Sequence, residues 1–357
     1  MSSVAPLAGP YAHAAVSVPR TMGLVMLALI PATVFGLWQF GWPAIALFGV
    51  TVAAAVAIEA ACLAVARRPL RALLDGSAVL TGWLLAMTLP PWAPWWIGVV
   101  GALIAILVAK QVFGGIGQNL FNPAMVARVA LLVSFPLEMT SFVAPLPLGS
   151  AGAPDLEAGL AITFGAGGYD AVTSATVLGA VRTGLGQGQD LGALLAEGWR
   201  PVSAAVGSTS GSLGETSALL LLAGGLFLIA KRVIPWQVPA AMLGSLALMA
   251  TVMHLIDPGR YPDAAFHVLS GAALLGAFFI ATDPVTSPVS VRGRLVFAAL
   301  IGVLVYVIRT WTNYPEGVAF AVMLANAATP VLDRWLRPRI YGRRRDGRPL
   351  GAGKEGR

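Results

Sequence analysis

The chain has 357 residues, of which 57% are hydrophobic and only 11% are charged, and its mean hydropathy is +0.79. This composition excludes a water-soluble globular protein and indicates an integral membrane protein. The formal net charge of +7 equals the charge of residues 334–357 alone, so it does not indicate a nucleic-acid partner.

Long apolar stretches recur along the chain. They favour transmembrane helices over a β-barrel, whose strands alternate apolar and polar residues. The 25 prolines and 41 glycines interrupt these stretches and predict broken helices. Residues 1–20 have no long apolar core, so we expect no cleavable signal peptide. The predicted spans are 21–39, 42–66, 76–90, 94–113 and 119–136, then 216–230, 236–254, 265–282, 294–310 and 316–333.

Basic residues set the expected orientation of these spans. Ten crossings place both chain ends on one side, together with Arg67, Lys110, Arg232 and Arg292. Because cytoplasmic loops are enriched in Lys and Arg, we expect both termini to be cytoplasmic. The connection 137–215 holds seven acids against two arginines and is then extracytoplasmic.

The two sets of five spans have related sequences. DGSAVLTGWLLAMTLPP (75–91) and SGAALLGAFFIATDP (270–284) align at an offset of 194 residues, with five identities over positions 76–90. The first copy would run outward and the second inward, which predicts two inverted five-helix repeats with the site at their junction. Chance recurrence of small residues in membrane helices is the alternative. The expected segments are a cytoplasmic start (1–20), two repeats (21–136 and 216–333), the extracytoplasmic connection (137–215) and a basic cytoplasmic tail (334–357).

Two predicted helix breaks carry polar residues. The run GGIGQNLFNPAMVARVALLVSFP (114–136) contains Asn119 and Asn122, and FFIATDPVTSP (278–288) contains Asp283 and Pro284. Irregular backbone at membrane depth needs a cover of protein or a cavity, and the next helix start offers free N–H groups. Helix capping explains either break alone, whereas two breaks at equivalent places favour a site.

Ionisable residues inside predicted spans are candidates for an ion path. Glu59 can bind or relay a cation, or can accept hydrogen bonds from neighbouring helices. Arg128 can neutralise a cofactor, pair with Glu59 or snorkel to the interface. Asp283 either belongs to the path or caps a half-helix. We interpret Lys110 as a topological anchor.

Metal-binding and iron–sulfur sites are not expected in this chain. Cys62 is the only cysteine, which excludes a cysteine-held cluster. His254 and His267 flank the turn LIDPGRYPDAAF without further ligands that we can identify, so we interpret them as interfacial residues.

The connection 137–215 contains YDAVTSATVLGA (169–180), a run of small and hydroxyl-bearing residues after an acid. Taken alone, such a run is an ordinary polar turn. Three longer runs, 114–136, FFIATDPVTSPVSVRGRLVF (278–297) and RTWTNYPEGVAFAVMLANAATPVLDRWLRPRIYG (309–342), resemble the D subunits of Rnf electron-transport complexes. Those subunits are related to the B subunits of sodium-pumping NADH:quinone oxidoreductases. The likeness extends from about Arg20 to Gly342.

The resemblance implies a covalent flavin. Those families attach FMN through its phosphate to the threonine of a D-x-x-[S/T]-x-[A/S/T]-T pattern, which Asp170, Thr173, Ala175 and Thr176 fill here. Thr176 is then the attachment residue. Ser174 stands where many relatives have glycine, but the acid and the attachment threonine are intact. A flavin transferase that uses FAD would make the bond.

The resemblance also implies a multi-pass subunit of the bacterial inner membrane. Its complex would exchange electrons between ferredoxin and NAD while moving Na⁺ or H⁺. Iron–sulfur clusters, NAD and further flavin would be held by partner subunits. A non-covalent second flavin, riboflavin, is expected near the break formed by Gly115, Gly117, Asn119, Asn122 and Pro123. A B subunit of the sodium pump, which usually has a longer N-terminal extension, and a redox-free transporter built from inverted repeats are the alternatives.

Overall fold

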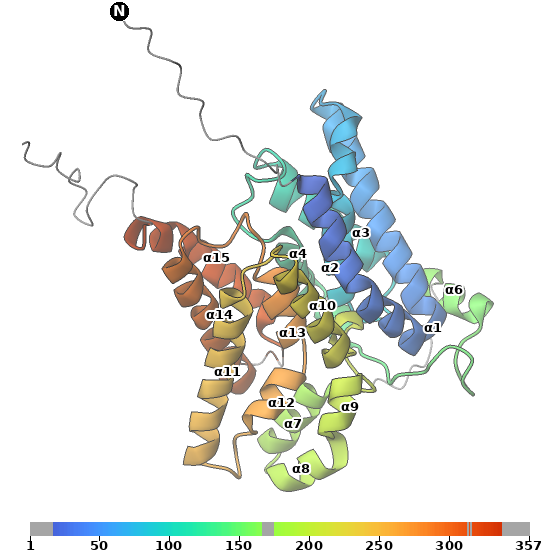
Figure 1. Ribbon diagram of the computed structural model, residues 1–357. Helices are drawn as coiled ribbons and strands as arrows, with labels where there is room; N and C mark the ends of the chain where they lie inside the picture. Colours follow the sequence, from blue (N-terminus) through green and yellow to red (C-terminus); the bar gives the residue numbers. More distant parts are fainter. Residues whose placement is uncertain (1–16, 166–174, 313, 315, 338–357) are drawn as a thin grey trace, which may run out of the picture.

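The computed structural model describes residues 17–165, 175–312, 314 and 316–337. Within these ranges the elements are helices, and no β-strand occurs. Figure 1 shows long helices in two groups, with a set of short helices gathered at the lower end of the bundle. The expected all-α membrane architecture is confirmed at this level.

Helix α1 (Val18–Val65) is a hairpin of two arms. Gly41 breaks it with φ of 74° and ψ of −159°, a conformation that favours a residue without Cβ. Figure 1 shows the two arms side by side. Each arm has more than the roughly 20 residues needed to cross a bilayer. The arms coincide with the predicted spans 21–39 and 42–66.

Several of the next helices are too short to cross the membrane alone. Helix α2 (Ser77–Thr88) and α4 (Pro123–Ser134) have 12 residues each. At about 1.5 Å per residue each spans roughly 18 Å, against a hydrocarbon core of about 30 Å. Between them, α3 (Trp95–Leu103) continues into the π-helical η2 (Ile104–Gln111). The broken helices expected from Gly and Pro are therefore present.

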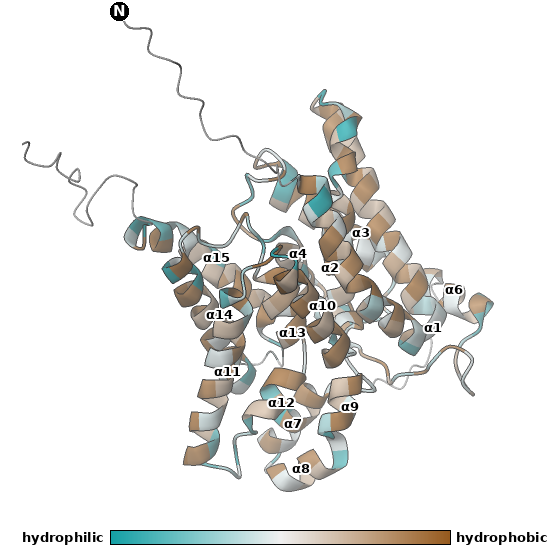
Figure 2. Cartoon of the chain, in the orientation of Figure 1, coloured by the Kyte–Doolittle hydropathy of each residue, from teal (hydrophilic) through white to brown (hydrophobic). Residues whose placement is uncertain are grey.

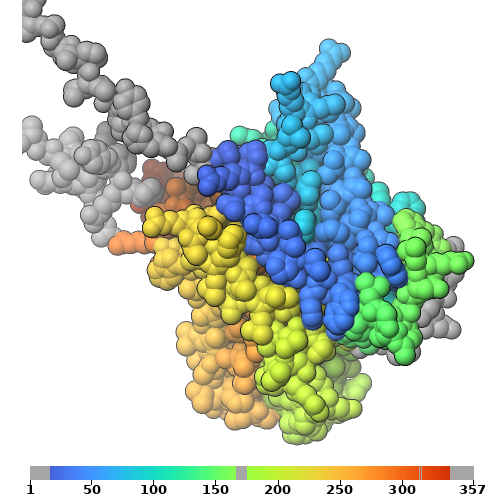
Figure 3. Space-filling view, turned by 45° about the vertical axis from the view of Figure 1, so that its right-hand side comes forward, coloured from blue at the N-terminus to red at the C-terminus, as the bar shows by residue number. Residues whose placement is uncertain are grey.

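The segment between the two groups forms short helices, several of them capped by polar side chains. Asp155, Thr176 and Asp190 accept hydrogen bonds from backbone N–H groups at three of the helix starts. Figure 3 shows the α7–α9 part as a lobe at the end of the molecule opposite η1 (Leu70–Asp75). The elements of this segment are α5 (Pro136–Thr140), α6 (Leu156–Phe164), α7 (Val177–Gly186), α8 (Leu191–Gly198), α9 (Pro201–Val206) and η3 (Leu213–Glu215).

The second group contains one span that is broken into pieces. The predicted span 265–282 becomes α12 (Ala264–Leu269), α13 (Ala273–Leu275) and the π-helical η4 (Gly276–Ile280). Gly271, with φ of 67°, interrupts it. The remaining elements are α10 (Ala218–Ala230), α11 (Gln237–Ile256), α14 (Val291–Trp311) and α15 (Val318–Trp335).

Small residues let these helices approach closely. A Cβ added at Gly302 on α14 would collide with Ser245 and with the Met242 carbonyl of α11, and one at Gly225 would collide with Phe278. This packing is typical of helices in membranes.

Three helices of the described part of the chain are long and apolar enough to cross a membrane, namely α1, α11 and α14. Figure 2 shows apolar residues along the outer faces of the bundle. Exposure of apolar side chains such as Leu248 on α11 to water is unfavourable, whereas their contact with lipid chains is favourable.

Candidate functional site

Thr176 is the N-cap residue of α7. Its Oγ1 accepts a hydrogen bond of 3.1 Å from the N–H of Gly179. The first N–H groups of a helix lack intrahelical partners and carry partial positive charge, so a phosphate on this oxygen would meet favourable donors. Thr176 is half-buried and Ala175 is exposed. The other residues of the pattern, Asp170, Thr173 and Ser174, lie outside the described residues.

A small cavity of about 10 Å³ lies beside Thr176, lined in part by Glu215 and Gly271. It falls far below the roughly 300–1,000 Å³ of ligand pockets, so a flavin ring attached here would lie outside it. Ser212 Oγ donates a hydrogen bond of 2.7 Å to Glu215 Oε1.

Glu215 ends the short helix η3 and is an unusually weak acid. Burial, and next the negative charge of Glu316, raise the pKa of Glu215 to about 7. The hydrogen bond from Ser212 and the positive charges of Arg128 and Arg309 oppose this rise. The carboxyl therefore exchanges its proton near neutral pH.

An ion pair lies next to Gly271. Arg309 donates to the carbonyl oxygens of His267 and Ser270, at 2.6 and 3.0 Å, and to both carboxylate oxygens of Glu316. A Cβ on Gly271 would collide with Glu316 and would lie 2.6 Å from an Arg309 nitrogen. This pair was not predicted from the sequence. Arg309 within the apolar run VLVYVIRTW was the available signal, because charges in membrane helices seldom lack a role.

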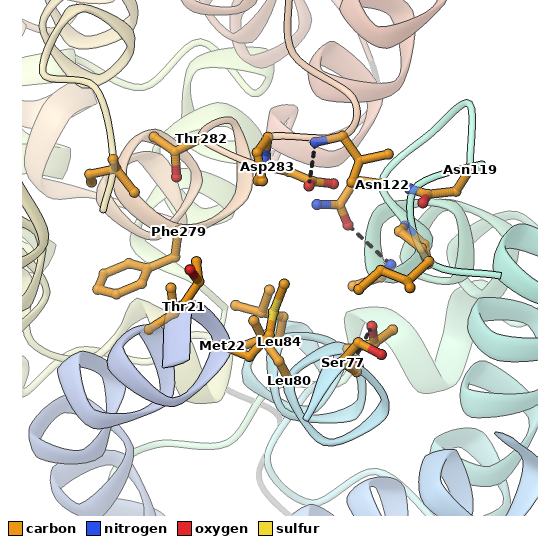
Figure 4. A pocket seen from close by; sticks show the side chains of 18 of the residues that line it. Thr21, Met22, Ser77, Leu80, Leu84, Asn119, Asn122, Phe279, Thr282 and Asp283 are labelled. Atoms are coloured by element: carbon orange, nitrogen blue, oxygen red, sulfur yellow. Dashed lines mark hydrogen bonds between the residues drawn. The ribbon is translucent and has the colours of Figure 1, made fainter. Parts of the chain in front are cut away.

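A second cavity, of about 110 Å³, lies where α1, α2, α4 and η4 meet. Asn119, Asn122, Pro123 and Asp283 line it, so the structure brings the two predicted breaks together. Figure 4 shows Thr282 and Asp283 on the side of the cavity opposite Leu80. The two π-helical stretches adjoin it: η2 ends near Lys110 and η4 ends just before Thr282. Such stretches are frequent at functional sites.

Not every predicted residue reaches this cavity. Gly115 and Gly117 belong to the connection before α4, at φ of 99° and 87°, and do not line it. Asn122 Oδ1 caps α4 by accepting from the N–H groups of Ala124 and Met125. Asn119 Nδ2 donates to the Phe121 carbonyl at 3.1 Å. Both amides thus bind backbone groups, and Asn122 Nδ2 also donates to the Ile280 carbonyl at 3.5 Å. At its present volume the cavity is smaller than a flavin ring requires.

Lys110 is a buried ion-pair partner, which corrects its interpretation as a topological anchor. Its Nζ lies 2.8 and 2.6 Å from the two carboxylate oxygens of Glu59 and 2.7 Å from Ser77 Oγ. Gln111 Nε2 adds a hydrogen bond of 2.9 Å to Glu59. Lys110 also lines the second cavity, so the Glu59 cluster borders it.

Arg128 does not pair with Glu59, and it does not snorkel. The Glu59 carboxylate is taken by Lys110, and Arg128 is only 7% exposed. Its Nη1 lies 3.5 Å from Met139 Sδ, a weak acceptor. The charges of Arg128 and Glu215 attract each other. The third interpretation of Arg128, neutralisation of a cofactor, stays a prediction.

Asp283 caps the turn that comes after η4. Its carboxylate accepts from the Val285 N–H at 3.1 Å and from Thr286 Oγ1 at 3.2 Å. It therefore fits a capping role, and its place in the cavity wall keeps it next to any cation or cofactor there. Among the described residues, no group of three or more His, Cys, Asp and Glu side chains could hold a metal ion.

Comparison with known proteins agrees with the sequence resemblance. The model of the NQR2, RnfD, RnfE family matches residues 7–342. A Halorhodospira halophila protein is 56% identical over 98% of this chain and 99% of its own length. Proteins of Stutzerimonas stutzeri and Rhodobacter capsulatus are 56% and 49% identical, over 95% and 85% of this chain and 96% and 85% of their own lengths. All three are named as the D subunit of an ion-translocating oxidoreductase complex. The chain therefore belongs to the NQR2, RnfD, RnfE family.

Proposed function

We propose that this chain is the membrane subunit of an ion-translocating ferredoxin:NAD oxidoreductase and carries FMN esterified through its phosphate to Thr176. The names of its relatives support the assignment to such a complex. The position of Thr176 at the start of α7 is the observation that carries the flavin assignment. When bound, FMN supplies one- and two-electron transfer, and the chain's own residues hold and orient it.

The residues around Thr176 have two tasks in this proposal. The free N–H groups of the first turn of α7 bind the phosphate oxygens, as helix starts do for anions. Glu215, whose pKa is raised to about 7, holds or releases a proton beside the attachment residue. Because Thr176 is half-buried and Ala175 is exposed, a flavin transferase can reach the hydroxyl.

The inverted-repeat architecture is part of the proposal. In the first half, Lys110 at the end of η2 donates a hydrogen bond to the side-chain oxygen of Ser77 at the start of α2. In the second half, Arg309 near the end of α14 donates a hydrogen bond to the backbone carbonyl of Ser270, just before α13. The two cations belong to corresponding helices, and each has a glutamate partner. This correspondence supports five-helix repeats of opposite orientation, with one site near each end of the bundle.

Riboflavin is the ligand that we propose for the cavity lined by Asn119, Asn122 and Pro123. The amides of Asn119 and Asn122 line the cavity, and exchange of their present backbone hydrogen bonds would supply donors and acceptors for a flavin ring. The cavity must widen to admit the ring, and the connection that contains Gly115 and Gly117 is the part of its surroundings without regular structure.

Na⁺ or H⁺ movement is proposed to involve Glu59 and Asp283, with Arg128 as a fixed positive charge. Glu59 is buried and forms an ion pair with Lys110, which lines the same cavity as Asp283. We place the start of α1 and the end of α15 on the cytoplasmic side of the inner membrane, with α7 outside. Arg67 and Arg68 follow the second arm of α1, at the open end of the hairpin where α1 also starts. Because cytoplasmic loops are enriched in arginine, they support this orientation.

In-gel fluorescence of the denatured subunit tests the flavin assignment. The chain is co-expressed with a flavin transferase, and parent, Thr176→Ala and Thr183→Ala are compared. Thr183 lies on the same helix and is exposed, so its variant is the matched control. We expect fluorescence in the parent and the control and none in Thr176→Ala. A non-fluorescent parent would contradict the flavin assignment and favour a redox-free transporter.

A further inference from the structure

A cavity of about 560 Å³ lies beside α7, separate from the small one that Thr176 lines. Helices α7 and α12, the end of α14 and the connection after α11 form its walls. In Figure 1 these elements lie together at the lower end of the bundle. The volume is within the range of about 300–1,000 Å³ that is usual for ligand pockets. Nothing in the flavin or ion proposals uses this space.

The charge of the lining is positive. Arg182, Arg260 and Arg309 line the cavity, and no carboxylate of the described residues does. Arg309 is paired with Glu316. Arg182 Nη1 donates to a neutral acceptor, the Arg309 carbonyl, at 2.8 Å. Arg260 contacts the ring face of Tyr261 at 5.7 Å. Within the described part of the chain no ion pair compensates Arg182 or Arg260, and two guanidinium charges remain for an anion.

Two buried hydrogen-bonding groups in the lining have no partner. His267 is 4% exposed, and neither of its ring nitrogens has a hydrogen-bond partner among the described residues. The Nε of Arg309, 5% exposed, also lacks one there. These nitrogens are themselves closed to solvent, so they lie behind the cavity surface, and the arginine head groups of the lining remain as the donors for a ligand.

The rest of the lining is apolar, and the surface around it suits lipid. Leu178, Val181 and Phe266 form the apolar wall. Trp311 lines the cavity and is 52% exposed, and Ile256 at the end of α11 is 69% exposed. Exposed tryptophan next to exposed aliphatic residues is typical of the membrane–water interface. The ligand therefore combines an anionic head with an apolar body.

We propose that this cavity binds the phosphate headgroup of an anionic phospholipid. The phosphate lies between Arg182 and Arg260, whose guanidinium groups donate to the headgroup oxygens. The acyl chains leave along the exposed apolar ends of α11 and α14. The size of the cavity and its apolar wall favour a lipid over free inorganic phosphate, which would use only the basic part. This proposal does not depend on a bound flavin.

Lipid retention by the assembled complex tests the proposal. The complex is delipidated in mild detergent and mixed with phosphatidylglycerol or phosphatidylcholine, and the lipid bound to this subunit is counted by native mass spectrometry. We expect the parent to retain phosphatidylglycerol in preference to phosphatidylcholine. Because each arginine near a membrane surface strengthens anionic lipid binding severalfold, the variant R182Q/R260Q should bind phosphatidylglycerol about thirtyfold more weakly.

Two variants keep the test decisive. Arg260→Gln alone changes an exposed side chain, so it should fold normally and still weaken binding. Arg292→Gln, also exposed, lies at the start of α14, far along that helix from the cavity, and should bind lipid like the parent. Equal retention by the parent and R182Q/R260Q would overturn the proposal. Displacement of the lipid by equimolar inorganic phosphate would assign the cavity to a soluble phosphate and overturn the lipid assignment.

Discussion

Lys110 and Glu59 form a buried ion pair in which the lysine Nζ contacts both carboxylate oxygens, at 2.8 and 2.6 Å. Their side chains are 3% and 6% exposed. The pair joins the second arm of α1 to η2, and Ser77 and Gln111 complete its hydrogen bonds. Neither charge is stable in this place without the other.

Removal of the lysine charge should therefore destabilise the protein strongly. We expect Lys110→Met to lower the free energy of unfolding by about 3–5 kcal/mol, because it leaves Glu59 buried and unpaired. Denaturant unfolding of the detergent-solubilised chain measures this. Lys231→Met, at an exposed lysine, is the control and should change little. Equal stability of the two variants would show that the Glu59 carboxylate does not need the lysine charge.

Replacement of the acid tests the ion path. Glu59→Gln keeps the side-chain shape and one acceptor for Lys110 but cannot bind a cation by charge. We expect ion uptake by the complex in vesicles to fall to a small fraction of the parent rate, while electron transfer continues uncoupled. Glu157→Gln, at an exposed acid in the α6 start, is the control. Unchanged coupling would remove Glu59 from the path.

Glu215 should make stability depend on pH. Its pKa is about 7 in the folded chain, against an ordinary value of 4.5. Between these values the folded state holds a proton that the unfolded state releases, so stability is full below about pH 4.5 and falls as pH rises to about 7. Glu215→Gln should flatten this part of the profile of melting temperature from pH 5 to 8. A Glu215→Gln profile as steep as the parent profile would assign the dependence to other groups.

The cap of α7 gives a prediction that is independent of flavin. Thr176→Ala should destabilise the flavin-free chain by about 1 kcal/mol, because the N–H of Gly179 loses its acceptor. Thr176→Ser retains the cap and should retain most of the stability. Thermal melting without the flavin transferase compares the three proteins. Equal melting temperatures would mean that this cap adds nothing to folding.

Gly271 should tolerate no side chain. Gly271→Ala introduces a Cβ at φ of 67° and drives it into Glu316, so we expect a loss of at least about 1 kcal/mol and a weakened Arg309–Glu316 pair. Gly244→Ala, where a Cβ would meet nothing within 4 Å, is the matched control and should be neutral or stabilising. Denaturant unfolding measures the free energy of unfolding of both variants. Equal values for the two variants would contradict the prediction.

Much of the fold could be predicted because apolar runs and their breaks are local properties of the sequence. The arms of α1 and helices α11 and α14 lie within a few residues of their predicted spans. The division of 265–282 into three helices was not predicted, because the left-handed conformation of Gly271 depends on tertiary contacts with Glu316 and Arg309.

The site was predictable in part for the same reason. Asn122 and Asp283 could be brought together by comparing the two halves, and both line one cavity. Lys110 was not predicted as the partner of Glu59, because it lies 51 residues away and only helix packing turns it inward. The cavity beside α7 escaped prediction because its residues come from three separated segments and show no common motif.

The π-helical turns of η2 set the rotational position of the residues at its end. A π-turn contains more residues than an α-turn, so the Lys110 side chain leaves the helix in a different direction from that in a continuous α-helix. Loss of a single residue from Ile104–Gln111 would tighten the helix and swing the ammonium group out of reach of Glu59. The contact between the lysine and its acid thus depends on how many residues this segment has as well as on which residues they are, and a one-residue deletion here would be as harmful as loss of the charge itself.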